Sequence, residues 1–244
     1  MSKRALLRSI LPGVVQVPLL RTSAFLLLDH RITLIDTGLR GSTARLLAAV
    51  RLAGRSPEQI ERIVITHCHP DHLGGLAELQ KVLPARTAIH AIEAPEVQSA
   101  EGPPPPFASA AVRRILSPVR RRAFFHRPVR IDELLRDGDE LPVLGGMRVI
   151  HTPGHTAGHI ALYFPRMALL IAGDALEHRG GRLAGPAAAF TADMSLALRS
   201  IAKLAELEVD VVAFSHFTRI PAGAGKRLRE LAGAVARDRS ACSL

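Results

Sequence analysis

Residues 66–75, with the sequence THCHPDHLGG, constrain the chain most, because they gather four potential metal ligands within six positions. An apolar, β-branched run precedes them at 62–65 and a helical pattern follows at 76–83, which predicts a loop leaving a strand. Imidazole and carboxylate groups are common ligands of zinc and iron. The alternative is a solvated polar loop. We therefore predict a metal site; its candidate ligands are His67, His69, Asp71 and His72.

Cys68 lies between the first two histidines. A thiolate can bind zinc, but alternate residues of an extended loop point to opposite sides. We expect Cys68 to pack behind the site.

The HxHxDH motif followed by two glycines resembles the signature of the metallo-β-lactamase superfamily, and the resemblance extends over roughly residues 14 to 235. It implies an α/β fold, a four-layer αββα sandwich with two mixed β-sheets flanked by helices. In that family a later histidine, an aspartate and a last histidine complete a two-metal site, each just beyond a strand. The matching candidates here are His155, Asp174 and His216, which follow the strand-like runs 147–150, 168–171 and 209–213.

The resemblance also implies how the ligands divide. One metal is assigned to His67, His69 and His155, the other to Asp71, His72 and His216, and Asp174 is the bridge. Asp71 and Asp174 are the implied catalytic residues, with Asp71 orienting the attacking hydroxide.

Two further histidines, His151 and His159, compete with His155. We prefer His155 because the preceding Pro-Gly pair makes a turn that points the next residue inward, and we expect His159 to act as a hydrogen-bond donor to a ligand. In the family, Asp36 supports the metal loop from beneath. An ordinary turn aspartate is the alternative.

Two divalent ions, with zinc as the first expectation and manganese or iron as alternatives, can hold a bridging hydroxide at neutral pH. The resulting prediction is a hydrolase that cleaves an ester, lactone or thioester of a small molecule. Antibiotic-hydrolysing β-lactamases of this superfamily lack the bridging aspartate, so Asp174 argues against β-lactam cleavage. Flavodiiron proteins have a glutamate where His69 stands, which argues against diiron oxygen chemistry. Glyoxalase II-like enzymes carry a helical glutathione-binding domain after the last histidine, and the 28 residues after His216 (244 − 216) are too few for it. Lactonases of the family place a tyrosine shortly after the bridging aspartate, whereas the only tyrosine here is Tyr163, before Asp174. A lactone or other ester stays possible without that tyrosine.

Three alternatives stay open. Many relatives read GHG or GHD where this chain reads SHF, so His216 is the least secure ligand. Without it, a mononuclear iron protein similar to persulfide dioxygenases becomes an alternative. The basic composition leaves a phosphodiesterase or RNase Z-like nuclease open, and a metal-stabilised binding protein is the non-enzymatic alternative.

The length of 244 residues and the 48% hydrophobic content suit a single domain spanning residues 1–244. The N-terminal segment is expected to be a strand rather than a signal peptide, and no transmembrane run is seen. With two cysteines and no disulfide framework, we expect a cytoplasmic protein.

The formal net charge of +10 raises the question of an anionic partner. Seven arginines and no acidic residue lie between 102 and 131, within a tetraproline-containing insertion or cap expected at about 100–130. This insertion can supply substrate contacts, a homodimer contact or only a solvated face. The partner we expect is a small-molecule substrate, anionic or acyl-bearing, rather than nucleic acid or a membrane.

The remaining pattern predicts a hairpin within residues 14–36, helices at 42–52, 194–207 and 226–237, and a second hairpin at 141–150. Asp193 is expected to cap the helix that starts at 194.

Overall fold

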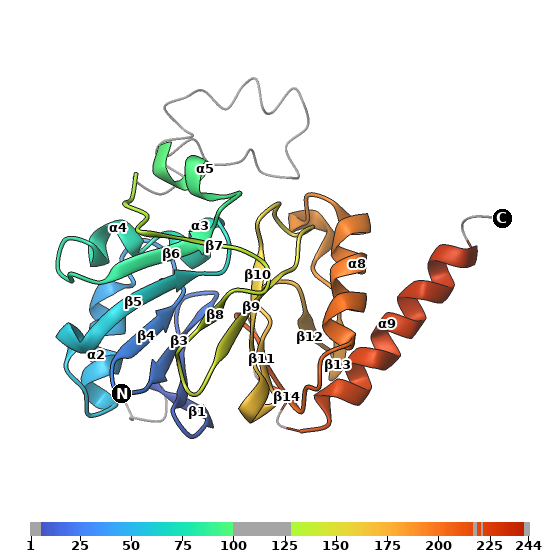
Figure 1. Ribbon diagram of the computed structural model, residues 1–244, viewed down its shortest axis with the longest axis horizontal. Helices are drawn as coiled ribbons and strands as arrows, with labels where there is room; N and C mark the ends of the chain where they lie inside the picture. Colours follow the sequence, from blue (N-terminus) through green and yellow to red (C-terminus); the bar gives the residue numbers. More distant parts are fainter. Residues whose placement is uncertain (1–5, 100–127, 217–218, 221, 242–244) are drawn as a thin grey trace. The chain divides into compact units, whose positions relative to one another are not determined.

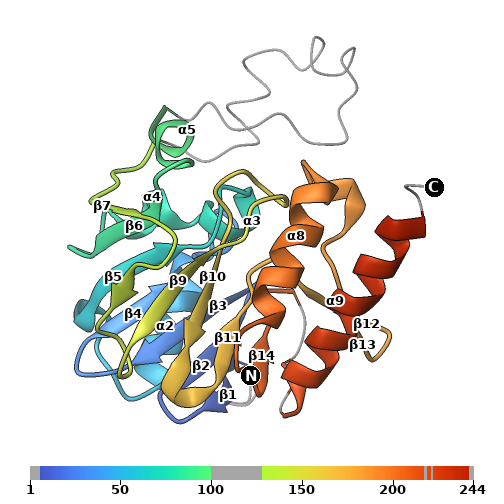
Figure 2. The same ribbon diagram turned by 45° about the vertical axis from the view of Figure 1, so that its right-hand side comes forward.

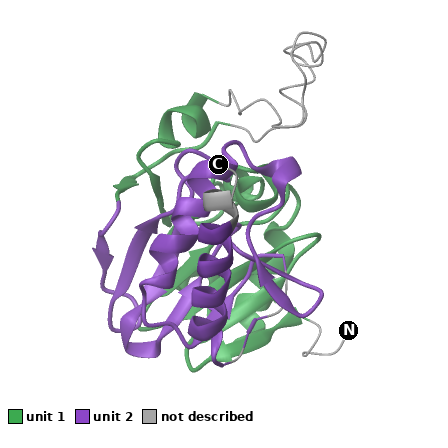
Figure 3. Ribbon diagram, turned by 90° about the vertical axis from the view of Figure 1, so that its right-hand side faces the viewer, with its two compact units in different colours: residues 1–136 green, residues 137–244 purple. Residues whose placement is uncertain are grey.

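The computed structural model describes residues 6–99, 128–216, 219–220 and 222–241 (Figure 1). The chain divides into two compact units, residues 1–136 and 137–244, which Figure 3 shows in different colours. Each unit has its own sheet and its own hydrophobic core. Residues 100–127 of the expected insertion lie outside the described residues, and the single-domain prediction stays a prediction.

The N-terminal unit contains one mixed sheet of seven strands, ordered as in the sequence. Neighbouring strands are antiparallel from the first to the fourth and parallel from the fourth to the seventh. Its strands are β1 (Arg8–Leu11), β2 (Val14–Pro18), β3 (Ser23–Leu28), β4 (Ile32–Ile35), β5 (Ile60–Ile65), β6 (Arg86–His90) and β7 (Glu133–Leu135). All four residues of β4 are buried, as expected for a strand covered on both faces.

Short helices pack their apolar residues onto this sheet. Leu46 and Val50 share one buried cluster with Leu34 and Ile63 of the central strands. Within the described residues of this unit, the helical elements are α2 (Thr43–Leu52), the 3₁₀ turn η1 (Pro57–Gln59), α3 (Pro70–Leu73), α4 (Leu76–Leu79) and α5 (Ala94–Ser99). The predicted hairpin and the helix at 42–52 are therefore present, and the helical pattern after the metal motif forms two short helices.

The C-terminal unit contains a five-stranded mixed sheet in the order β14-β11-β10-β9-β8. Its strands, with a separate two-stranded hairpin of β12 and β13, are β8 (Glu140–Leu141), β9 (Met147–His151), β10 (Ile160–Phe164), β11 (Leu169–Ile171), β12 (Glu177–Arg179), β13 (Arg182–Ala184) and β14 (Val211–Ala213). β10 is antiparallel to both β9 and β11, and β11 is parallel to β14. Consequently β9, β11 and β14 run in the same direction and end at one edge of the sheet.

Two long helices cover this sheet, and Figures 1 and 2 both show them side by side. They are α8 (Met194–Ala205) and α9 (Ala224–Ala241), and the unit also has the 3₁₀ turns η2 (Pro165–Met167) and η3 (Ala188–Phe190). Ile201 and Leu204 of α8 and Leu228 of α9 share a buried cluster with strand residues such as Leu170 and Val212. The helices at 194–207 and 226–237 were predicted, whereas the β12–β13 hairpin was not. Among the described helices, none has the length and apolar character of a membrane span.

Asp193 caps α8 as predicted: its Oδ1 atom accepts a hydrogen bond from the backbone N–H of Leu196 at 2.9 Å. We expect Asp193→Ala to lower the free energy of unfolding by about 1 kcal/mol, because one N–H of the first turn loses its acceptor. Denaturant titration measures this change. Glu206→Ala at the exposed other end of the same helix is the control and should change it by less than about 0.5 kcal/mol. Equal effects of the two substitutions would contradict the assigned cap.

Candidate metal centre

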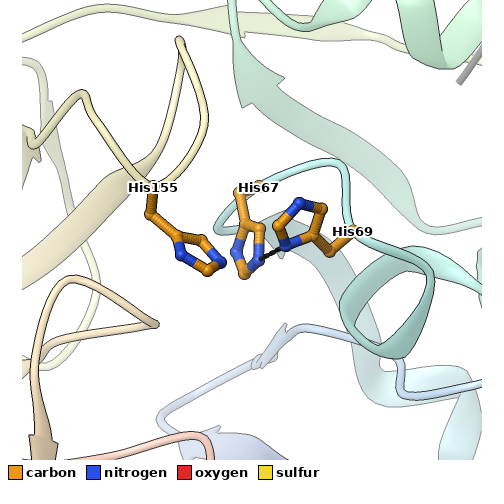
Figure 4. A group of neighbouring side chains, drawn as sticks. All are labelled: His67, His69 and His155. Carbon is orange, nitrogen blue, oxygen red and sulfur yellow. Dashed lines mark hydrogen bonds between the residues drawn. The ribbon is translucent and has the colours of Figure 1, made fainter. Parts of the chain in front are cut away.

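The first cluster of predicted ligands lies in the loop after β5, and we call it the N-terminal cluster: His67, His69, Asp71 and His72. The loop is extended at His69 (φ −66°, ψ 145°), and Pro70 then begins α3 at the first helical position. The Nε2 atom of His67 lies 3.2 Å from the Nδ1 atom of His69 (Figure 4). The spacing HxH thus brings two imidazole nitrogens together.

This nitrogen pair fits one metal ion. Two nitrogens bound at about 2.0–2.1 Å in tetrahedral directions are about 3.3 Å apart. The separation of 3.2 Å between His67 Nε2 and His69 Nδ1 is close to that value. The donor set around it consists of imidazoles and carboxylate oxygens, which suit zinc, iron and manganese.

A buried carboxylate orients the third histidine. Asp36 Oδ2 lies 2.8 Å from His72 Nδ1, and both side chains are fully buried. The Nε2 atom of His72 lies 3.9 Å from Asp71 Oδ2, on the side of the other candidate ligands. A carboxylate on one ring nitrogen fixes a ligand's tautomer and leaves the other nitrogen for the metal. Asp36 therefore has the supporting contact that the family resemblance implied.

Thr66 links this carboxylate to His67. The backbone N–H of Thr66 donates to Asp36 Oδ1 at 2.8 Å, and its hydroxyl lies 2.8 Å from Asp36 Oδ2 and 3.1 Å from His67 Nδ1. Since the hydroxyl donates to the carboxylate, it accepts from Nδ1–H of His67. The lone pair of His67 then lies on Nε2, the atom that faces His69.

The two glycines that end the motif allow the loop to pack closely. A Cβ atom on Gly74 would lie 2.4 Å from the carbonyl oxygen of Pro70, and one on Gly75 would lie 2.6 Å from that of Thr37. Thr37 in turn donates its backbone N–H and its hydroxyl to the carbonyl oxygen of His72, at 2.6 and 3.0 Å. Larger residues at 74 or 75 would push the metal loop away from this anchor.

Cys68 lies on the opposite side of the loop from its histidine neighbours, as predicted. Its side chain is buried in the core of the N-terminal unit, and its Sγ atom lies 3.8 Å from Glu96 Oε2. Burial, together with the nearby Glu93 and Glu96 carboxylates, raises the pKa of the Cys68 thiol well above its ordinary value.

The remaining predicted ligands form a second cluster, in the C-terminal unit, which we call the C-terminal cluster: His155, Asp174 and His216. They follow β9, β11 and β14, the three strands that end at the same sheet edge. One oxygen, Asp174 Oδ2, lies 3.4 Å from His155 Nε2 and 3.0 Å from His216 Nε2. The structure thus brings together all three residues despite their separation in the sequence.

The turn before His155 depends on Gly154. This glycine has φ +132°, and a Cβ atom there would lie 2.2 Å from the backbone nitrogen of Ala197 in α8. The residues just before the helix also donate backbone hydrogen bonds to the turn, from Asp193 to Gly154 and from Ala192 to His155. The Nδ1 atom of His155 lies 3.4 Å from the hydroxyl of Thr191, and its Nε2 atom faces Asp174.

The competing histidines have other contacts. The Nε2 atom of His151 lies 3.0 Å from the carbonyl oxygen of Ala157, while His159 is bonded to Thr152 and to the backbone of Asp174. The expectation that His159 donates to a ligand was wrong in direction, because its Nε2 atom accepts the Asp174 N–H. Sequence reasoning also missed the threonines at 66, 152 and 191, whose positions beside the motif histidines gave only a weak local signal.

Comparison with known proteins assigns the family. The model of the metallo-β-lactamase superfamily matches residues 17–216. The chain belongs to the metallo-β-lactamase superfamily. A solved metallo-β-lactamase family protein from Thermus thermophilus is similar, with a TM-score of 0.72 and 29% identity over 96% of this chain and 82% of that one. The resemblance in sequence and the α/β fold class with mixed sheets flanked by helices are thereby confirmed.

Two curated relatives add to this assignment. The probable metallo-hydrolase YflN of Bacillus subtilis is 32% identical over 77% of this chain and 75% of its own length. A hydroxyacylglutathione hydrolase of Pseudomonas aeruginosa is 33% identical, but the match covers 54% of this chain and 40% of that enzyme. Both relatives are named as hydrolases, and the metallo-β-lactamase fold of this chain implies divalent metal binding.

Tyr163 is engaged elsewhere in the C-terminal unit. Its hydroxyl donates to the carbonyl oxygen of Glu208 at 2.9 Å, and the side chain is buried in the core of that unit. Burial, followed by the nearby Glu208, raises the pKa of Tyr163.

The raised pKa of Glu96 predicts how the free energy of unfolding changes with pH. Burial, followed by the neighbouring Glu93 carboxylate, raises the pKa of Glu96 to about 7. The folded chain therefore binds this proton more tightly than the unfolded chain, and the associated stability, complete below pH about 4.5, is lost as pH rises through about 7. We expect the free energy of unfolding to fall by about 1–2 kcal/mol more for the wild type than for Glu96→Gln over this window, after allowing for solvent screening of the half-exposed carboxyl.

Urea titrations at pH 4.5, 6 and 8 measure the difference. Asp132→Asn is the matched control, because hydrogen bonds from Thr87 and Arg130 lower the pKa of that carboxyl despite its partial burial. Because that pKa lies below its ordinary value of 3.8, Asp132 stays ionised at all three pH values, and Asp132→Asn should leave the pH dependence over this window as in the wild type. Parallel pH profiles for the wild type and Glu96→Gln would refute the prediction.

A second prediction concerns Gly154. We expect Gly154→Ala to lower the free energy of unfolding by about 1–3 kcal/mol and to weaken metal binding, because backbone strain and the contact with Ala197 displace His155. Gly181→Ala separates the two causes, since Gly181 has φ +80° but nothing lies within 4 Å of a Cβ atom there. Thermal unfolding and metal titration should show the larger loss for Gly154→Ala. Equal losses would mean that strain alone matters.

Proposed function

We propose that the N-terminal and C-terminal clusters form one dinuclear metal centre that hydrolyses an ester, lactone or thioester bond of a small molecule. In this proposal His67, His69 and His155 hold one ion, Asp71, His72 and His216 hold the other, and Asp174 bridges them. Zinc is the expected metal, with manganese or iron as alternatives. The proposal also keeps a single domain and a cytoplasmic location, the latter favoured by the low cysteine content.

One observation carries the dinuclear assignment. A single oxygen of Asp174 contacts His155 and His216, which the family pattern assigns to different ions. A carboxylate oxygen placed between two such ligands is suited to bridging. This contact also supports His216 as a ligand although its flanking residues depart from the usual family pattern.

When bound, two divalent ions polarise the scissile carbonyl and lower the pKa of water. The protein holds the ligands in place. Asp36 fixes His72 through Nδ1, and Thr66 fixes His67. In this proposal Asp71 orients the attacking nucleophile by accepting a hydrogen bond from it.

The substrate class is argued from a relative and from the net charge. The hydroxyacylglutathione hydrolase among the relatives favours a small acyl substrate, but this chain spans less than half of that enzyme. The net charge of +10 favours an anionic or acyl-bearing molecule. No specific observation favours the nuclease or the iron dioxygenase.

The decisive experiment combines metal analysis with a substrate panel. Protein purified without added metal should contain near two divalent ions per chain and should hydrolyse members of a lactone, ester and thioester panel, with chelation abolishing turnover. We expect His69→Ala and Asp174→Asn to reduce turnover by more than the roughly 10–100-fold typical for loss of an outer partner, because each removes a ligand.

His30→Gln is the control, since His30 is exposed and its hydrogen bonds with Asp29 and Arg55 are made by its backbone atoms. It should retain both ions and full turnover. One iron per chain with oxygen consumption would replace the hydrolase by a dioxygenase. Two ions without turnover on the panel or on a phosphodiester would favour a metal-stabilised binding protein.

A further inference from the structure

His159 contacts the backbone of the loop that carries Asp174. Its side chain is fully buried just before β10, and its Nε2 atom accepts the backbone N–H of Asp174 at 2.9 Å. A ring nitrogen that accepts an N–H carries no proton itself, so the ring proton of neutral His159 is on Nδ1.

Thr152 fixes this tautomer. Its hydroxyl oxygen lies 2.7 Å from His159 Nδ1 and 3.4 Å from the carbonyl oxygen of His159. Nδ1–H therefore donates to the hydroxyl, and the hydroxyl donates to the carbonyl group. The backbone N–H of Thr152 also donates to this carbonyl at 2.9 Å, which ties the end of β9 to the start of β10.

Gly173 allows the loop to lie directly against this ring. It has φ +54°, and a Cβ atom there would lie 2.6 Å from His159 Nε2 and 3.0 Å from its Cε1. Any side chain at position 173 would therefore push the backbone of Gly173 and Asp174 away from the imidazole.

The carboxylate of Asp174 depends on the same backbone. Its Oδ2 atom contacts both His155 Nε2 and His216 Nε2, and only two side-chain torsions separate it from the backbone that His159 holds. A shift of this backbone would move the oxygen away from both histidines together.

We propose that His159 is a positioning residue whose Nε2 atom, held in its accepting tautomer by Thr152, keeps the Asp174 backbone where its carboxylate can bridge two metal ions. This proposal rests on the proposed dinuclear centre. Both ring nitrogens of His159 are used in these bonds, so its effect on the metal is exerted through Asp174.

Two substitutions of His159 test the proposal, because their side chains carry the same amide group and differ in length by one methylene. In His159→Gln the side-chain amide occupies the region of Nε2 and can still accept the Asp174 N–H. In His159→Asn the amide occupies the region of Nδ1, where it can bond Thr152 but does not reach Asp174. If His159 only fills space in the core, the two variants should bind metal equally well.

Metal binding is measured by titrating each metal-free variant with Co²⁺ against a competing chelator, with the visible spectrum recorded at each step. We expect His159→Gln to keep the wild-type stoichiometry, spectrum and affinity within about threefold. His159→Asn should weaken the affinity by about 10–100-fold, as is typical for loss of an outer-shell partner, and alter the spectrum. His151→Gln is the control, since His151 bonds the Ala157 carbonyl rather than Asp174, and should match the wild type.

Equal Co²⁺ affinities and spectra for the Asn and Gln variants would overturn the proposal. If either variant does not fold, Thr152→Val tests it instead, because this change removes the hydroxyl that fixes the tautomer and leaves the histidine in place. Wild-type Co²⁺ binding by Thr152→Val would equally overturn it. Failure of the proposed hydrolysis is a separate result, since a protein that turns over no substrate can still show the difference between Gln and Asn in Co²⁺ binding.

Discussion

The buried carboxylate of Asp36 is the interaction on which the metal loop depends. It lies at the end of β4 with φ +58°, a left-handed conformation that aspartate tolerates better than most residues. A buried charge is costly unless it is hydrogen-bonded, and Asp36 accepts from the backbone and hydroxyl of Thr66 and contacts His72. These contacts join the ends of two parallel strands to α3. The direction in which His72 presents Nε2 is therefore set by the sheet rather than by the loop alone.

Strand direction explains why the three residues of the C-terminal cluster meet. β9, β11 and β14 run in the same direction, so the residues that follow them emerge at one edge of the sheet. Polar residues just beyond apolar strands converge there although His155 and His216 are far apart in the sequence. Gly154 and Gly173 then allow the two turns to approach α8 and His159 at distances that a side chain would prevent.

These regularities decide how much could be predicted. The residues of both clusters could be named as candidate ligands because each stands just beyond a strand, and the strands and main helices have clear periodicity. Their role as metal ligands stays a prediction. Two contacts could not be predicted from the sequence: that of His155 with Thr191, 36 positions apart, and that of His159 with Asp174, 15 positions apart. Each depends on a particular side-chain rotamer. The β12–β13 hairpin was missed because its strands have three residues each and little alternation. The basic segment at 100–127 lies outside the described residues, so its role stays a prediction.

Each unit uses a threonine to give a histidine a defined lone pair. In the N-terminal unit, Nδ1–H of His67 donates to Thr66, whose hydroxyl donates to the Asp36 carboxylate. In the C-terminal unit, Nδ1–H of His159 donates to Thr152, whose hydroxyl donates to a backbone carbonyl. Because a hydroxyl that has donated to a fixed acceptor can only accept from the imidazole, both rings are held with the lone pair on Nε2. One of these lone pairs faces His69, and the other accepts the backbone N–H of Asp174. The same arrangement therefore orients a candidate ligand in the N-terminal unit and supports a candidate ligand in the C-terminal unit.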